Sequence, residues 1–247
     1  MENILLPSKM YFAPGEREHE AILTIEPLHH GYGTTVGNTL RRILLSSLPG
    51  AAVVGMKIKG VQHEFSAVTG VKEDVLEIML NLKQLRMKVH SEEPVTLKLT
   101  ANKAGEVTAA DIAPNADVEI MNKELVICTL TDAANFDMDI VVSRGRGYLP
   151  TEEREETTSE IGMIAVDAMF SPVRQVGLRI ENTRVGEITN YDKLIMSIVT
   201  DGTVTPQEAV EHATKIILNH FTWIQSQLSH ASLTEQIAKA ADASAEG

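Results

Sequence analysis

The sequence contains a single cysteine, Cys128, and aromatic side chains make up only 4% of the chain. One cysteine excludes an internal disulfide, which fits a reducing compartment such as the cytoplasm. Positive charge is also scarce, because 22 lysines and arginines stand against 34 aspartates and glutamates and leave a net charge of −12. A broad phosphate-binding surface needs clustered lysine and arginine, so the composition argues against one.

Long apolar runs are missing as well. The best of them, residues 43–54, is interrupted by two serines, a proline and a glycine, and it is far too short to span a membrane. No basic segment leads into an apolar stretch near the start, so no signal peptide is predicted. We therefore expect a cytoplasmic protein without membrane contact. Its 247 residues, 43% of them hydrophobic, suffice for one large globular domain or two ordinary ones.

One segment invites a nucleotide-binding interpretation. GYGTTVG at 31–37 follows a predicted strand and precedes a predicted helix. The dinucleotide fingerprint needs a third glycine where Val36 stands, and the Gly-Lys-Ser/Thr of a phosphate loop is missing. A flexible turn that leads into the helix is therefore favoured, and a small nucleotide-using enzyme remains the alternative.

Other candidates for chemistry are weak. The eight histidines form no metal-binding pattern, and no HExxH, CxxC or GxSxG motif occurs, so we expect no catalytic residues, no metal and no cofactor. Cys128 lies in an apolar strand pattern, which favours a buried structural thiol. RGRGY at 144–148 suggests a small nucleic-acid contact, but a turn that leaves a strand is the favoured interpretation.

Hydrophobic periodicity predicts an α+β fold. Residues 1–18 are polar and irregular, 151–160 form an acidic solvated loop, and 228–247 form a frayed or disordered tail. Helices are predicted at 36–48, about 71–85 and 205–224. Strands are predicted at 20–25, 51–58, 86–91, 95–101, 117–120, 124–130, 137–144, 173–182 and 193–200. The two strong helices lie near opposite ends, which indicates a discontinuous domain built from both ends with a β-rich domain inserted between them.

Each of these two helices leaves a question open. On the first, Arg42 lies roughly 200° from the core-facing Leu40, and Asn38 and Leu45 share that far side. A leucine beside arginine and asparagine indicates a second interface or simply a scattered surface leucine. On the last, Thr205 and Glu208 form a capping box, and the apolar stripe is either intramolecular core or half of a symmetric dimer interface.

Several long segments closely resemble the bacterial RNA polymerase alpha subunit family, in the order found there. They cover about residues 5–227 and include EPLHHGYGTTVGNTLRRILLSSLPGAAV (26–53), GVQHEFSAVTGVKEDVLEIMLNLKQL (60–85), RGRGYLP (144–150), VDAMFSPVRQV (166–176) and ENTRVGEITNYDKL (181–194).

The resemblance implies a dimerisation subdomain at 1–50 and 177–227 and an inserted β-rich subdomain at 51–176, and the composition adds a flexible tail at 228–247. It implies a homodimer in which one copy binds the beta subunit and the other binds beta-prime, in an enzyme that also contains omega and sigma. The chain would thus be a non-catalytic scaffold within a nucleotidyltransferase. By this resemblance the dimer contacts are Leu40, Ile43, Leu44, Ile217, Phe221 and Ile224.

The resemblance also bears on DNA binding. Family members usually continue through a linker into a small helical DNA-binding domain, whereas this sequence stops at Gly247, so no direct DNA binding is expected. A free-standing dimeric module that recruits other partners remains a further alternative.

The resemblance also implies which residues contact the large subunits. The beta-subunit contacts correspond to Asn38, Arg42, Leu45, Ser46 and His63, and the beta-prime contacts to Arg184 and Lys193.

Overall fold

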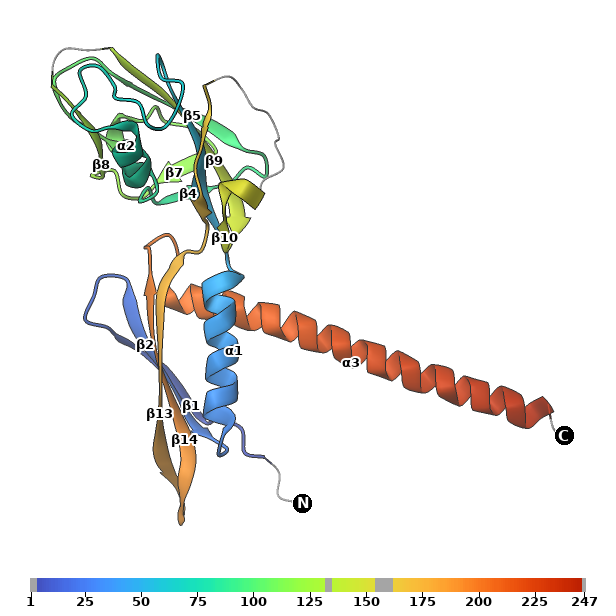
Figure 1. Ribbon diagram of the computed structural model, residues 1–247. Coiled ribbons are helices and arrows are strands. Elements are labelled where there is room, and N and C mark those ends of the chain that lie inside the picture. Colours follow the sequence, from blue (N-terminus) through green and yellow to red (C-terminus); the bar gives the residue numbers. More distant parts are fainter. Residues whose placement is uncertain (1–3, 132–134, 154–161, 246–247) are drawn as a thin grey trace.

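The computed structural model describes residues 4–131, 135–153 and 162–245, with side chains as far as Leu228. The fold is α+β, as the sequence predicts, and it forms two units that lie one above the other in Figure 1. The long last helix projects far from the lower unit (Figure 1). The alternation of buried and exposed residues along the strands explains why each sheet has one face on a core.

The lower unit combines the two ends of the described chain. Its antiparallel sheet has the strand order β1-β2-β14-β13, and α1 and α3 pack against one face. Leu23, Leu44 and Met196 have no exposed surface in this core. The elements are β1 (Lys9–Pro14), β2 (Glu20–Leu28), α1 (Tyr32–Ser46), β13 (Val173–Val185), β14 (Ile188–Thr200) and α3 (Pro206–Ala245).

The upper unit has a separate core in which α2 packs against a four-stranded sheet of order β11-β3-β9-β5. Three two-stranded pairs surround it, namely β4-β7, β6-β8 and β10-β12. The elements are β3 (Pro49–Ile58), α2 (Val75–Leu82), β4 (Met87–Val89), β5 (Val95–Ala101), β6 (Gly105–Thr108), η1 (Ala109–Asp111), β7 (Val118–Ile120), β8 (Val126–Leu130), β9 (Phe136–Arg146), β10 (Tyr148–Leu149), η2 (Thr151–Glu153), β11 (Ile164–Ala165) and β12 (Ala168–Met169).

Several predicted features are confirmed. The strand at 95–101 is β5, and Cys128 is fully buried, where burial raises the pKa of its thiol to about 12. The capping box at the start of α3 is present: the Glu208 backbone N–H donates to Thr205 Oγ1 at 3.2 Å, and the Thr205 N–H donates to Glu208 Oε2 at 2.8 Å.

The flexible glycine turn predicted at 31–37 is wrong. Helix α1 begins at Tyr32, directly after Gly31, so Gly33 and Gly37 are helical and buried. A Cβ at Gly37 would lie 2.5 Å from Cδ1 of Leu178 on β13. Glycine weakens a helix by itself. Here its lack of a side chain lets the helix lie close against the sheet, so packing outweighs propensity.

Two chain ends also differ from prediction. Residues 9–14, expected to be irregular, form the edge strand β1, which has a single neighbour and is mostly exposed. The region 228–247, expected to be a frayed tail, is helical as far as Ala245, because no glycine or proline interrupts 207–245. Of the acidic loop at 151–160, η2 covers 151–153 and the rest lies outside the described residues.

Candidate partner-binding surfaces

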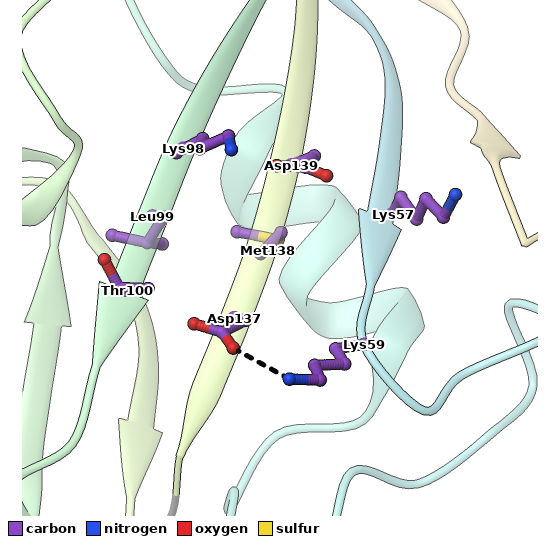
Figure 2. Close-up of a pocket in the computed structure, with 8 residues that line it drawn as sticks. All are labelled: Lys57, Lys59, Lys98, Leu99, Thr100, Asp137, Met138 and Asp139. Carbon is purple, nitrogen blue, oxygen red and sulfur yellow. Dashed lines mark ion pairs between the residues drawn. The ribbon is translucent and has the colours of Figure 1, made fainter.

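A shallow cavity of about 380 Å³ lies on the outer face of the upper sheet (Figure 2). Lys57 stands opposite Asp139, and Asp139 stands opposite Lys98, so the charges alternate across three strands. A second pair joins Lys59 Nζ to Asp137 Oδ2 at 3.5 Å. Such cross-strand pairs stabilise a sheet. The ladder of paired lysines and aspartates therefore accounts for the charged lining of this cavity.

Nowhere in residues 4–131, 135–153 and 162–245 do three histidine, cysteine, aspartate or glutamate side chains come together as metal ligands would. No helix in this part of the chain is both long enough and apolar enough to cross a bilayer.

Helix α1 divides into a buried and an exposed face. Gly37, Leu40 and Leu44 are buried against the sheet, and Asn38 and Arg42 are exposed. This division matches the predicted periodicity. Exposure keeps these polar side chains accessible, although it does not by itself identify what they bind.

At the carboxyl end of α1, the Ser46 hydroxyl donates to the Arg42 carbonyl at 2.8 Å. Ser46 is exposed, whereas Leu45 is half-buried and packs against the lower core. Part of the leucine surface that sequence periodicity placed on the far side is thus already covered by this chain.

The amino end of α1 is capped from a distant strand. Gly31, the residue before the helix, has no side chain to act as a cap. Asp192 of β14 is buried, and its Oδ2 accepts from the backbone N–H groups of Gly31 at 2.9 Å and Gly33 at 3.0 Å. A carboxylate at this end also interacts favourably with the helix dipole. Asp192 therefore fixes where α1 begins on the sheet, a role that no local sequence pattern signals.

Replacing Asp192 with alanine should destabilise the chain by about 1–3 kcal/mol, because two helix N–H groups lose their buried acceptor. Chemical denaturation measures this loss, and amide exchange at Gly31 and Gly33 should accelerate. Asp192→Asn keeps one acceptor oxygen and should lose less. Equal losses for the two variants would show that the cap contributes little.

His63 belongs to the upper unit, on the loop between β3 and α2. It is exposed, and its Nδ1 lies 3.1 Å from the Ser66 hydroxyl. Phe65, two residues on, is also largely exposed and was not singled out from the sequence.

The two predicted beta-prime contacts lie on the long β13–β14 hairpin. Arg184 is exposed near the hairpin tip, and its Nε donates to the Gly186 carbonyl. Lys193 is half-buried and stands opposite Glu181 on β13. Both belong to the lower unit, on a different element from Arg42.

The six predicted dimer contacts divide into two groups. Leu40 and Leu44 are 6% and 0% exposed inside this chain, so little of their surface is open to a second copy. The reason is that the same stripe already packs on the sheet of its own chain. Ile43 and Ile217 are half-buried at the margin of that core, whereas Phe221 and Ile224 are 62% and 47% exposed.

The exposed part of α3 carries more apolar surface than was predicted. Ile216 and Ile217 are the last of its described side chains to pack against the lower core. Beyond them the helix continues outward (Figure 1). Leu228 follows Ile224 by four residues, so the two share a helix face. Leu228 was not predicted there, because residues 228–247 were expected to form a frayed tail. The large exposed apolar side chains are Leu218, Phe221, Trp223, Ile224 and Leu228.

Comparison with known proteins adds independent information. Residues 56–171 match the family model described as RNA polymerase Rpb3/RpoA insert domain. The chain is 53% identical over 196 residues to DNA-directed RNA polymerase subunit alpha of Oceanobacillus iheyensis, covering 79% of this chain and 62% of the relative. It is 47% identical over 212 residues to the subunit of that name from Alkaliphilus oremlandii, covering 86% and 67%.

A third relative is the DNA-directed RNA polymerase subunit alpha of Symbiobacterium thermophilum. Identity is 54% over 196 residues, covering 79% of this chain and again 62% of the relative. The chain thus spans about three fifths to two thirds of the length of these curated relatives.

Proposed function

Because this chain belongs to the DNA-directed RNA polymerase alpha subunit family, we propose that it is a non-catalytic scaffold that dimerises and binds the two large polymerase subunits. The observation that carries the proposal is the row of exposed apolar side chains on the projecting part of α3. In the proposed assembly one copy binds the beta subunit and the other binds beta-prime, within an enzyme that also contains omega and sigma.

The exposed row on α3 supports pairing with a second copy. Phe221, Ile224 and Leu228 recur at intervals of three and four residues and so share one helix face. Burying each such side chain is worth about 1.5–3 kcal/mol. A helix with no tertiary contacts is marginal in water, so the projecting part of α3 gains most from a partner. A twofold dimer supplies the same apolar row from the other copy.

The exposed face of α1 supports a second interface on the same unit. Asn38, Arg42 and Ser46 stay accessible because the opposite face of the helix packs on the sheet. Arginine is enriched at the energetic centres of protein interfaces. We assign these residues, together with Leu45 and the separate His63, to beta-subunit binding, and Arg184 and Lys193 to beta-prime binding.

An alternative enzymatic role loses its main support in the sequence. Of the three glycines that suggested a nucleotide site, Gly33 and Gly37 face β13 and β14 rather than an open cavity, and Gly31 lies in the left-handed turn before α1. The assignment of the chain to the cytoplasm rests on its single cysteine and remains part of the proposal.

Equilibrium binding of purified beta subunit to the chain tests the proposed function. Wild type should bind, and Arg42→Ala should weaken binding by about tenfold or more, because truncating a central interface arginine costs about 2 kcal/mol or more. The homodimer should persist in Arg42→Ala, as measured by light scattering.

The matched control is Arg41→Ala, on the neighbouring exposed position of α1 nearer the edge of that face. It should bind the beta subunit more nearly like wild type. Loss of the dimer in Arg42→Ala would place this residue in the other interface. Failure of wild type to bind the beta subunit would favour a free-standing dimeric module instead.

A further inference from the structure

The segment Arg144–Gly145–Arg146 leaves the upper sheet at the junction of the two units. Successive strand residues face opposite sides. A Cβ at Gly145 would lie 2.6 Å from the ring of Phe170, which is buried, so Gly145 faces inward. Arg144 and Arg146 therefore share the opposite side of the strand, and both are exposed. Packing explains the glycine at position 145, because a side chain there would collide with the Phe170 ring. Packing does not explain the two exposed arginines.

These arginines adjoin the carboxyl end of α1. Arg146 stands opposite Pro49, three residues after Ser46. A Cβ at Gly147 would lie 3.0 Å from the Ser46 carbonyl oxygen, so the two segments touch at that point. Ser46 in turn lies one helical turn after Arg42, to whose carbonyl its hydroxyl donates. The line of exposed α1 residues thus ends at the RGRGY segment.

The three guanidinium groups of Arg42, Arg144 and Arg146 have no acidic partner within the described part of the chain. Elsewhere in the same structure, Arg179 pairs with Glu181 at 3.0 Å. A guanidinium matches a carboxylate with two parallel hydrogen bonds, which makes arginine suited to binding acidic groups at an interface. In a chain of net charge −12, three exposed arginines that converge on one junction form a surface suited to an acidic partner.

The neighbouring charges favour a protein over a nucleic acid. Desolvation raises the pKa of the Tyr148 hydroxyl, and so does the negative charge of Asp167, Glu152 and Glu153, which lie around it. A phosphate backbone that followed the row past Tyr148 would meet these carboxylates. A short acidic protein segment can end before them.

We propose that Arg144 and Arg146 extend the Arg42 surface and that a carboxylate-bearing segment of the beta subunit binds across the three arginines. This inference rests on the proposed function. If it holds, the interface with the beta subunit continues across the junction from the lower to the upper unit. Binding of the beta subunit would then also fix the orientation of the two units relative to each other.

The test is equilibrium binding of purified beta subunit to the full chain carrying Arg144→Glu and Arg146→Glu together. Binding should weaken by about tenfold or more, and it should depend less steeply on salt than wild-type binding, because the attraction between charges has been removed. The homodimer and the unfolding midpoint should be unchanged. Arg144→Gln with Arg146→Gln should weaken binding in the same direction by less, and it decides the question if the glutamate variant does not fold.

The matched control is Lys103→Glu with Lys123→Glu, an equal change of net charge at exposed turns of the upper unit. It should bind like wild type. If the Arg144 and Arg146 variants bind normally while Arg42→Ala is weakened, this inference is overturned and the proposed function stands. If they lose affinity for a DNA duplex or for RNA rather than for the beta subunit, the inference is also overturned. If wild type does not bind the beta subunit, both proposals fall.

Discussion

Replacing both Phe221 and Ile224 with aspartate should convert the dimer into folded monomers. Phe221 and Ile224 are 62% and 47% exposed in the single chain and belong to none of the described hydrophobic cores, so the substitutions should leave these cores intact. In the proposed dimer each aspartate would be buried beside apolar groups without a partner charge. An uncompensated buried charge costs several kcal/mol, so the dissociation constant should rise by roughly a thousandfold or more.

Sedimentation velocity at micromolar concentration measures the outcome. Asn219→Asp is the matched control, because position 219 lies roughly 200° around α3 from Phe221 and carries an exposed polar side chain. This variant should remain a dimer. A dimer that survives in the double variant would show that the apolar row faces something other than a second copy, and a double variant that unfolds would show that the row contacts its own chain.

Hydrophobic periodicity predicts which residues share a helix face, but not which surface covers that face. It correctly separated the inner and outer faces of α1, so that Leu44 is buried and Arg42 exposed. It could not tell which surface covers an apolar stripe. Leu44 and Phe221 looked alike as dimer contacts, yet one is enclosed by its own sheet and the other is open. Burial against a strand far away in sequence decides between them.

The glycines of α1 and its cap, Asp192 on β14, show a second limit of prediction from local sequence patterns. A local pattern at 31–37 predicts a turn, because glycine usually weakens a helix. The helix nevertheless includes Gly33 and Gly37, since they fit against β13 and β14, and Asp192 supplies the cap that Gly31 lacks. These features depend on residues about 140 to 160 positions apart in the sequence. Where the signal was local, as in the Thr205–Glu208 capping box, the sequence predicted the hydrogen bonds correctly.

Gly50→Ala, at the junction of the two units, should strongly lower the stability of the fold. A Cβ at Gly50 would lie 1.8 Å from the Phe170 carbonyl oxygen and 3.0 Å from its carbonyl carbon. Both are backbone atoms, so no side-chain rotation relieves the clash, and the two segments that connect the units must move apart. Overpacking of this kind costs about 3 kcal/mol or more, and the melting temperature should fall by roughly 6–12 °C.

Gly55→Ala on the same strand is the matched control for Gly50→Ala. Its nearest contact would be the Met163 sulfur at 3.2 Å, and a flexible thioether can shift by a few tenths of an ångström. Calorimetry should therefore show a marked loss for Gly50→Ala and little change for Gly55→Ala. Equal melting temperatures for wild type and Gly50→Ala would mean that the connection between the units is loose. In that case the Arg42, Arg144 and Arg146 side chains would not be held together before a partner binds, and the continuous interface would form only in the assembled complex.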